Sequence, residues 1–492
     1  MQVKISKKKY FIRLLKKFEY LSLFAILISL FNNGSSYSYS ELRKHETEKG
    51  WTQLSGILKK IKAPKFPNKE FLITKFGAVA DQVTDCKSAF DKAIFECSKN
   101  GGGKIIIPPG NYIIKGPIHL RNNVNLHLQK GALIKFSNDS EDYLPVVFTR
   151  WEGMECYNYS SLIYALGQEN IAITGEGIFD AQANESNWWS WKGNKSFGWK
   201  EGMPSQSDSI GRPLLVKMNN LQTPVNERIF GKGHYLRPNF LQLINCRNVL
   251  IEGVTFLNSP MWVIHPILCQ NVIIKDVSTI GIGPNTDGCD PESCKNVLIK
   301  NCYFKNGDDC IAIKSGRNYD GRRINIPSEN IIIQNCKMND GHGGVTIGSE
   351  ISGGCRNVFA ENCEMDSPDL DRAIRIKANF YRGGLVENIF IRNIKIGEVK
   401  DAVIHFDMQY EPAEGKYGAF IPEWRNINVR GVTSKKSNQA LYFVGLDESY
   451  INNIKIEKCR FDGVKKGSTI QNVKGLVIRD TYINDKLQVF IK

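Results

Sequence analysis

The recurrence of asparagine at the head of short apolar strands constrains this chain more than any other feature. Ten segments begin with Asn and continue with alternating apolar residues, as in NVLIEGVTF, NVLIKNCYF and NIIIQNCKM. They start at Asn123, Asn170, Asn248, Asn271, Asn296, Asn330, Asn357, Asn388, Asn426 and Asn453. From Asn248 onward the step is shortest between Asn248 and Asn271 and longest between Asn388 and Asn426. Self-similarity at such a period is typical of a stack of repeating units.

The spacers between these strands indicate what kind of stack it is. They carry no helical periodicity, which argues against a parallel sheet with crossover helices. The leucine–asparagine consensus of a leucine-rich repeat is also absent. We therefore predict an all-β fold, a parallel β-helix in which short intervals form bare coils and long intervals carry a loop.

The N-terminal end of such a stack needs a cover, because the first coil would otherwise expose its interior. Residues 89–97 have a helical pattern of apolar residues, with Asp85 as a candidate N-cap and Gly101–Gly103 as a terminator. We expect this helix to cap a β-helix domain over residues 71–492. The polar, mixed segment 37–70 is expected to be a linker or an N-terminal strap.

Residues 1–36 have the features of a signal peptide. Basic residues occur between Lys4 and Lys17, a largely apolar run spans Leu21–Phe31, and small residues follow at 34–36. The run is shorter than the ~20 residues that cross a bilayer. We therefore predict a secreted or periplasmic protein with no membrane association after cleavage.

Net charge indicates the kind of partner. The chain carries +15 at neutral pH, and residues 1–40 contribute seven Lys/Arg and one Glu, which leaves about +9 for the remainder. A basic body suits an acidic ligand. The sequence has no recognisable nucleic-acid-binding module, so we expect a polyanionic sugar and no nucleic acid.

The thirteen cysteines do not form a metal or disulfide framework by their spacing. Several recur after Asn, at Cys246, Cys302, Cys336 and Cys363, which indicates one repeated interior position where Cys serves as a small apolar side chain. No CxxC pair is present, so a zinc site is not expected. We predict no metal and no cofactor.

An insertion at 184–236 interrupts the repeat. It contains Trp188, Trp189, Trp191, Phe197 and Trp199, interleaved with Lys192, Lys195 and Lys200. The rings can stack on sugars while the lysines meet carboxylates, or the loop can pack its own aromatics on the wall of the solenoid. Long loops in compact domains are often functional, but the sequence leaves both interpretations open.

A set of charged residues recurs at coil-length intervals. Asp308 follows Asp287 by one bare coil, and the step from Asp309 to His342 equals the step from His342 to Arg375. Equivalent positions in successive coils lie ~4.8 Å apart, so we expect these groups on four adjacent coils at one angular position. Asp308 and Asp309 can share a cleft only at a turn or bulge, which Gly307 favours.

Paired carboxylates suit the cleavage of a glycosidic bond, which needs a protonated acid and an ionised base. Their repulsion is expected to raise the pKa of one of them, and His342 to adjust the balance. Arg375 and Lys377 share one face of a strand and are candidate ligands for substrate carboxylates. Asn285 and Lys314, in the same stretch as the aspartates, are further candidate substrate-binding residues.

Each motif also has an ordinary structural interpretation. Adjacent Asp residues near Asn and Gly are common in turns, and Arg375 and Lys377 can belong to a solvated strand face. NTDG at 285–288 faintly resembles a calcium loop, but the spacing of an EF-hand is not met. The common register of the motifs favours a functional cleft.

Four motifs together resemble glycoside hydrolase family 28, the polygalacturonases: Asn285–Gly288 (NTDG), Gly307–Asp309 (GDD), Gly341–Gly343 (GHG) and Arg375–Lys377 (RIK). Phe76-Gly77-Ala78 and Arg237-Pro238 are similar to bacterial members. Many fungal members have Gln where this chain has Gly307. The resemblance covers residues 71–480.

The resemblance implies a right-handed β-helix that hydrolyses α-1,4-galacturonosyl bonds with inversion. The expected substrate is an acidic pectic polysaccharide or an oligogalacturonide, and we expect the protein to be a monomer. Asp308 would be the general acid, Asp287 and Asp309 would activate water, and His342 would support the acid. Arg375 and Lys377 would bind galacturonate. The insertion at 184–236 would close one end of the groove for exo action.

Two alternatives stay open from the residues alone. A pectate-type lyase shares the solenoid, uses Arg or Lys as the base and needs calcium. A non-catalytic β-helix would bind the polysaccharide without cleaving it.

Overall fold

A computed structural model describes residues 50–410 and 418–491 of the chain. The predicted signal peptide at 1–36 lies outside the described residues, as do residues 37–49 of the predicted linker. In the remaining part of that segment Leu54, Ile57 and Ile61 are buried. Within the described ranges, no helix combines the length and the apolar character needed to cross a membrane.

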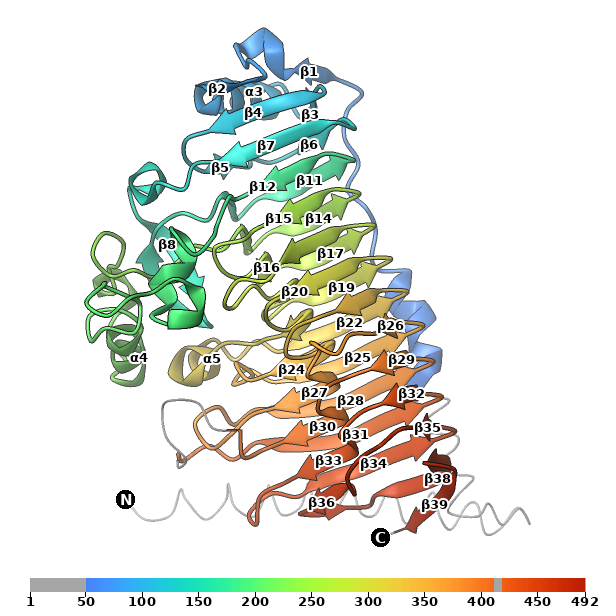
Figure 1. Cartoon of the computed structure of the whole chain (residues 1–492). Coiled ribbons are helices and arrows are strands. Elements are labelled where there is room, and N and C mark those ends of the chain that lie inside the picture. Colours follow the sequence, from blue (N-terminus) through green and yellow to red (C-terminus); the bar gives the residue numbers. More distant parts are fainter. Residues whose placement is uncertain (1–49, 411–417, 492) are drawn as a thin grey trace, which may run out of the picture. The chain divides into compact units, whose positions relative to one another are not determined.

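The described residues from Leu54 onward form one unit, and this unit is the predicted parallel β-helix (Figure 1). Most coils contribute three strands, one to each face of the solenoid, and nearly all neighbours pair in parallel. The first face holds β1 (Glu70–Leu72), β3 (Gly103–Ile107), β6 (Val124–Leu128), β11 (Glu169–Gly175), β14 (Arg247–Glu252), β17 (Gln270–Lys275), β19 (Lys295–Lys300), β22 (Ser328–Gln334), β25 (Cys355–Glu361), β28 (Leu385–Arg392), β31 (Glu423–Arg430) and β34 (Ile451–Glu457).

The other two faces follow the same order. The second holds β2 (Asp81–Asp85), β4 (Gly110–Ile114), β7 (Ala132–Phe136), β12 (Ile178–Asp180), β15 (Thr255–Leu257), β18 (Ser278–Gly281), β20 (Tyr303–Asn306), β23 (Lys337–Asn339), β26 (Glu364–Met365), β29 (Lys395–Glu398), β32 (Thr433–Lys436) and β35 (Arg460–Phe461). The third holds β5 (Ile118–His119), β10 (Ile163–Leu166), β13 (Leu241–Ile244), β16 (Ile264–Ile267), β21 (Ile311–Ile313), β24 (Val345–Gly348), β27 (Arg372–Lys377), β30 (Ala402–Asp407), β33 (Gln439–Val444) and β36 (Thr469–Gln471).

The ten repeated asparagines form a continuous ladder at the start of the first face. Each has a left-handed backbone, with φ between 54° and 63°, a conformation that Asn tolerates better than most residues. From Asn170 to Asn453, each side-chain amide donates a hydrogen bond of 2.9–3.5 Å to the asparagine of the preceding coil. The repeated asparagines therefore hydrogen-bond successive coils to one another and align them in register.

The interior is a column of apolar side chains stacked from coil to coil. All thirteen cysteines are free and buried. Cys246, Cys302, Cys336 and Cys363 lie in this core, which confirms the interior position that their spacing predicted.

Both ends of the solenoid are covered. Helix α3 (Lys87–Lys99) packs Phe90, Ile94 and Cys97 into the core at the N-terminal end, as predicted. The N-cap is Cys86, one residue after the predicted Asp85. The side chain of Asp85 accepts a hydrogen bond of 3.0 Å from the backbone N–H of Lys87. At the other end β37 (Val473–Lys474) and β38 (Val477–Ile483) precede β39 (Lys486–Ile491), which pairs antiparallel with β38.

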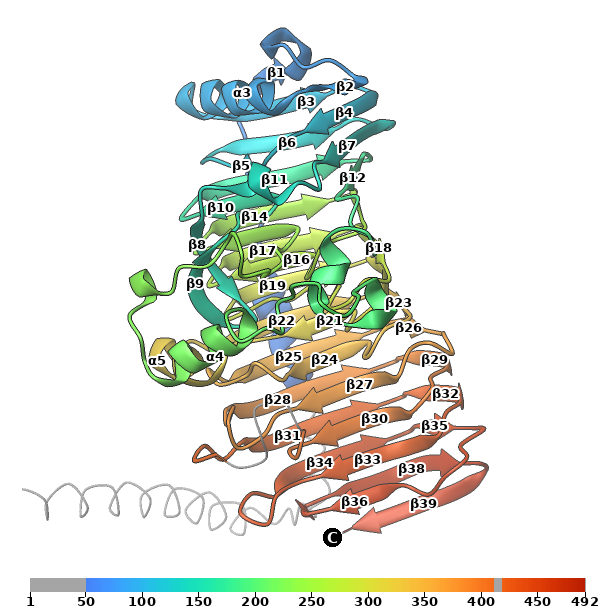
Figure 2. The ribbon, with the colours of Figure 1, turned by 60° about the vertical axis from the view of Figure 1, so that its left-hand side comes forward.

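The long loops gather beside the third face (Figure 2). They comprise the hairpin β8 (Val147–Trp151) and β9 (Met154–Asn158), with helices α4 (Arg212–Asn220) and α5 (Asn318–Ile324), which contact one another and β9. Short 3-10 helices complete these and other connections: η1 (Ile73–Phe76), η2 (Ser140–Tyr143), η3 (Trp188–Lys192), η4 (Lys195–Phe197) and η5 (Val225–Glu227). These loops form a second wall opposite the strands.

Candidate active site

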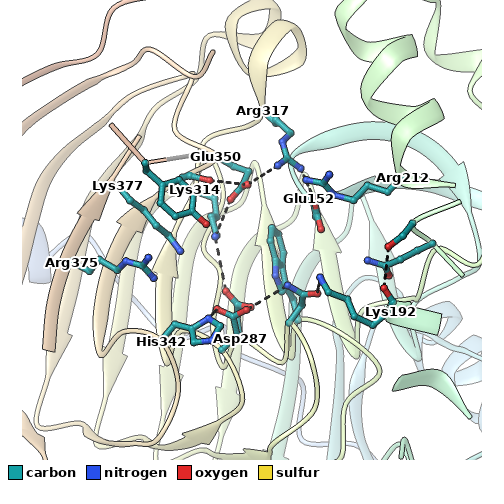
Figure 3. A pocket seen from close by; sticks show the side chains of 17 residues that line it. Glu152, Lys192, Arg212, Asp287, Lys314, Arg317, His342, Glu350, Arg375 and Lys377 are labelled. Carbon is teal, nitrogen blue, oxygen red and sulfur yellow. Dashed lines mark hydrogen bonds and ion pairs between the residues drawn. The ribbon is translucent and has the colours of Figure 1, made fainter. Parts of the chain in front are cut away.

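A polar pocket of about 460 Å³ lies between the third face and the loops (Figure 3). Its lining is dominated by charged side chains. The strand side and its turns contribute Trp262, Asn285, Asp287, Asp308, Lys314, His342, Ser349, Glu350, Arg375, Lys377 and Tyr410, and the loop side contributes Glu152, Lys192, Gln206, Ser207, Arg212 and Arg317.

Consecutive coils bring the predicted motifs together. Asp287 lies in the segment between β18 and β19, and the backbone of Gly288 donates to the carbonyl of Asp309, 3.0 Å away. Asp308 and Asp309 lie between β20 and β21, and His342 lies between β23 and β24. The sequence therefore placed these groups on adjacent coils correctly.

The cationic pair departs from the expected common position. In the β24–β27 pairing Arg375 lies opposite Thr346, and Lys377 lies opposite Gly348, farther along the strand than His342. The steps from Asp309 to His342 and from His342 to Arg375 are equal in length, but the two connections differ in shape. Arg375 therefore does not lie at the same angular position as His342. The long side chain of Lys377 nevertheless reaches Asp309, with Nζ 2.8 Å from a carboxylate oxygen.

Gly307 makes the turn that presents both aspartates, as predicted. A Cβ at this position would lie 2.2 Å from the carbonyl oxygen of Gly283, so no larger residue fits. After this turn Asp308 bonds to His342 across the coil boundary, with Oδ1 2.9 Å from Nδ1. The backbone of Asp309 donates to the same oxygen at 2.9 Å.

Asp308 and His342 form an ion pair at the edge of the pocket. Burial favours a neutral Asp308, but the imidazolium of His342, with Lys377 and Lys314, outweighs that effect and lowers the pKa of Asp308. The charge and hydrogen bond of Asp308 raise the pKa of His342 to about 9. At neutral pH the pair therefore holds one proton, on the histidine.

Of the three motif aspartates, Asp287 is the one whose pKa is raised. Burial is the main cause, and the negative charges of Asp308 and Asp290 add to it. Its Oδ1 is buried and makes no hydrogen bond within the described part of the chain, and its other oxygen is 4.0 Å from Nζ of Lys314. The predicted increase is therefore wrong for the adjacent pair Asp308 and Asp309, because neighbouring cations lower the pKa of both; repulsion contributes, after burial, at Asp287.

Asp309 lies behind the pocket lining and is completely buried. Burial would raise the pKa of Asp309, but Lys377 and Arg375 lower it. Arg375 approaches within 3.5 Å and the hydroxyl of Thr346 donates at 3.1 Å. Arg375 and Lys377 therefore neutralise an enzyme carboxylate as well as line the pocket.

Asn285 and Lys314, two further predicted residues, connect the turns that carry the aspartates to their surroundings. Asn285 donates to Asp308 at 3.4 Å and accepts hydrogen bonds from Lys192 and Arg237 at 2.8 and 2.9 Å. Lys314 pairs with Glu350 at 3.0 Å and lies over the ring of Trp262, 4.8 Å from its centroid.

The loop wall contains functional candidates for which the sequence carries no signal. Glu152, at the tip of the β8–β9 hairpin, accepts from Nε of Arg212 at 2.8 Å and from Arg317. Arg317 also approaches Glu350, 3.5 Å away. These residues come from four segments, and no shared motif or periodicity marks them.

The tryptophans of the insertion pack mainly on the solenoid. Trp188 and Trp189 are buried, and Trp191 and Phe197 pack against the core. Trp199 is partly buried and donates to the carbonyl of Met203, while Lys195 and Lys200 are exposed. Of the three interleaved lysines, Lys192 alone lines the pocket. The aromatic rings therefore follow the second interpretation, in which the loop packs its own aromatics on the wall of the solenoid.

One oxygen from each of Asp287, Asp308 and Asp309 lies within 4.8 Å of the others, a spacing that a metal ion could bridge. Calcium prefers six to eight oxygen ligands. Here the three carboxylates are instead surrounded by Lys314, His342, Arg375 and Lys377. The donor set fits an ion-pair network better than a calcium site.

Comparisons with known proteins agree with the motifs. The family model described as "Glycosyl hydrolases family 28" matches residues 229–481, and "Rhamnogalacturonase A/epimerase, pectate lyase-like" matches 71–129. A probable polygalacturonase of Vitis vinifera is 28% identical, covering 76% of this chain and 70% of its own. The exo-poly-alpha-D-galacturonosidase of Dickeya chrysanthemi is 26% identical, covering 76% and 64%.

Solved structures extend the likeness. The hyperthermoactive exopolygalacturonase of Thermotoga maritima is 44% identical, with a TM-score of 0.85 over 89% of this chain and 97% of that one. The polygalacturonase of Erwinia carotovora, at 21% identity and a TM-score of 0.62, shares the fold. The solenoid is therefore a right-handed parallel β-helix.

Proposed function

The chain belongs to glycosyl hydrolase family 28, and from this premise we propose that it is a secreted polygalacturonase that hydrolyses α-1,4-galacturonosyl bonds of pectin from the chain end, with inversion. The arrangement that carries the proposal is the cluster of Asp287, Asp308 and Asp309 in a pocket lined by cations. The carboxyls suit acid–base cleavage, and the cations suit an acidic sugar.

Asp308 is the proposed general acid, and His342 is proposed to supply it with a proton. The pair stores one proton on the imidazole, 2.9 Å from the carboxylate oxygen. Substrate that displaces water from the pocket weakens the solvation of this ion pair, which favours transfer of the proton to Asp308 and then to the leaving glycosidic oxygen. His342 is 52% exposed at its side chain, so it can recover a proton from solvent.

The resemblance gives the activation of water to Asp287 and Asp309; we assign it to Asp287, which lines the pocket, because Asp309 is completely buried behind the lining. The charge of Asp308 helps to raise the pKa of Asp287. Once Asp308 is protonated that contribution disappears, which favours release of any proton on Asp287 to bulk water and leaves a carboxylate that can accept a proton from the attacking water. Asp309, held ionised by Lys377 and Arg375, stabilises the positive charge that develops on the sugar.

Inversion is proposed from the resemblance. The oxygens of the three carboxylates approach within 4.8 Å, closer than the ~6.5–9.5 Å typical of inverting enzymes. The attacking water would therefore lie beside the acid and not between two separated carboxyls. The anomer released first, followed by NMR during a short digestion, tests this point: an α-anomer would overturn inversion.

Exo action is proposed from the loop wall. Lys192 and Arg212, from the insertion, and Glu152, from the hairpin, line one side of the pocket, which favours a closed end over an open groove. The solved Thermotoga structure at 44% identity is described as an exopolygalacturonase. Product sizing over a short time course on homogalacturonan tests it: only short oligomers at early times support exo action, and a ladder of sizes overturns it.

The hydrolase itself is tested by incubating the protein with polygalacturonate, with and without a chelator. Reducing ends that appear without an ultraviolet-absorbing unsaturated product, and that are insensitive to the chelator, support hydrolysis. Unsaturated product that disappears with the chelator would assign a lyase instead. Binding without any new reducing ends would assign a non-catalytic protein.

A further inference from the structure

The tip of the β8–β9 hairpin carries a conformational outlier that points into the pocket. Glu152 has a left-handed backbone with φ 43°, and Gly153 follows with φ 79°. Tight hairpin turns of this kind favour Asn or Asp before Gly, and a long side chain in the left-handed region is uncommon. Strain at a non-glycine residue points to function when the surrounding structure fixes it.

The surrounding structure does fix this tip. The backbone of Arg317 donates to the carbonyl of Gly153 at 2.9 Å, and a Cβ on Gly153 would lie 2.8 Å from that same nitrogen. Next to Glu152, the indole of Trp151 donates to the carbonyl of Arg237 at 2.9 Å. Arg237 in turn donates to Asn285, which bonds to Asp308. The position of Glu152 relative to the acid is therefore set by a short chain of contacts.

The tip and the acid line one pocket. Glu152 and Asp308 both belong to the lining of the pocket of about 460 Å³, and Lys192 and Arg237 donate to Asn285, which bonds to Asp308. Because the hairpin forms part of the wall of this pocket, we expect the sugar chain to end beside it.

Glu152 places a carboxylate at the end of a pocket that is proposed to bind an acidic sugar, which is unexpected because like charges repel. Arg212 and Arg317 keep Glu152 ionised, and with Lys192 they lower its pKa to about 2 against the effect of burial. Both arginines donate to the same oxygen, Oε2, whereas an ionised carboxylate offers about four acceptor positions. A galacturonate carboxylate would be repelled here, but a sugar hydroxyl could donate to the remaining positions.

We propose that Glu152 is a specificity-determining residue that accepts a hydrogen bond from the free 4-hydroxyl of the terminal, non-reducing galacturonate. Every interior unit of an α-1,4-linked chain has this oxygen in a glycosidic bond and cannot donate from it. The hydroxyl thus marks the chain end, and Glu152 recognises it. This inference rests on the proposed function, and it names the group that makes the enzyme exo-acting.

Two disaccharides test it: saturated digalacturonide, and its 4,5-unsaturated counterpart made with a lyase, which lacks the terminal 4-hydroxyl. A hydrogen bond to a charged group is worth about 1.5–3 kcal/mol, so the wild-type protein is expected to prefer the saturated substrate by about 10- to 100-fold in kcat/KM. Glu152→Ala should lose a similar factor on the saturated substrate, change little on the unsaturated one, and so abolish the preference.

Two further variants separate recognition from structural support. Glu152→Gln keeps an acceptor without the charge and should show an intermediate preference. Glu201→Ala removes an exposed glutamate of the insertion and should leave the preference unchanged.

Equal losses on both disaccharides in Glu152→Ala would make Glu152 a structural clamp for the arginines and overturn the inference. A wild-type protein that shows no preference would overturn it as well. A wild-type protein that cleaves neither disaccharide nor polygalacturonate would instead refute the proposed function.

Discussion

The two walls of the pocket are built in different ways. On the strand wall, side chains on neighbouring coils meet because the repeat brings them there, as with Asp308 and His342, 34 residues apart. On the loop wall, Glu152 and Arg317 are 165 residues apart and meet because a hairpin and an inserted loop fold back on the solenoid. The first wall holds the groups proposed for chemistry, and the second holds those proposed for selecting the substrate.

The groups for chemistry and those for substrate selection can therefore change independently in such a fold. A loop can be remodelled without moving a coil, whereas the coils fix the reacting groups. Variants on the strand wall should therefore lower the rate, and variants on the loop wall should change which substrate is preferred.

Asp308→Asn should have the largest effect on the strand wall. General acid catalysis contributes roughly 10²–10⁴-fold, and we expect a loss of about 10³-fold in the release of reducing ends, with binding of oligogalacturonide retained. Asp369→Asn, which changes an exposed aspartate, is the matched control. Activity within severalfold of wild type would remove Asp308 from the role of acid.

His342→Gln should come next, and its signature is in the pH profile. In the wild type the stored proton is lost near pH 9, because Asp308 raises the pKa of His342 to about that value. Without the imidazole, Asp308 alone must keep the proton, so the alkaline limb of kcat/KM should move to lower pH. We expect about a 10- to 100-fold loss at pH 7; an unchanged alkaline limb would contradict the shared proton.

Arg375→Ala should have a smaller effect, mainly on KM. Arg375 lines the pocket and is 7% exposed, and loss of one charge-assisted contact to a substrate carboxylate should raise KM about tenfold. Arg425→Ala, which alters an exposed arginine paired with Glu387, is the control. A fall in kcat at constant KM would indicate that Arg375 acts chiefly through Asp309.

Asp290→Asn should have the smallest effect, on stability. Burial raises the pKa of Asp290, and neither of its oxygens has a hydrogen-bond partner within the described ranges. The native state therefore holds a proton that the unfolded state releases above pH ~4, so this residue costs stability as pH rises. The variant should gain about 1 kcal/mol at pH 7 relative to pH 4, measured by denaturant unfolding; a loss at pH 7 would mean that Asp290 is ionised and needed by Lys314.

The strand wall could be predicted from the sequence because its motifs follow the repeat. Asp287, Asp308, Asp309 and His342 were identified by spacing, and so was the turn at Gly307. Spacing failed for Arg375 and Lys377, since connections of equal length but different shape placed them farther along the strand. It also did not indicate which carboxyl would have a raised pKa, because that depends on burial and on the neighbouring cations.

The loop wall could not be predicted in this way. Glu152, Arg212 and Arg317 have no common period, and their meeting depends on tertiary contacts of long loops. The tryptophans were the visible feature of the insertion, yet most of them pack on the solenoid. The lysine among them, Lys192, is the residue that enters the pocket.

The asparagine ladder has a consequence for how such a molecule can be altered. Because each amide bonds to the asparagine of the preceding coil, a loop within a coil can lengthen without breaking the ladder, whereas the stack itself grows only by whole coils. Adding a coil between Asn426 and Asn453 would lengthen the cylinder and leave the reacting groups untouched. Adding one between Asp308 and Asn330 would move Asp308 away from His342 by one coil, so the ladder fixes the spacing of the groups that are proposed for the chemistry.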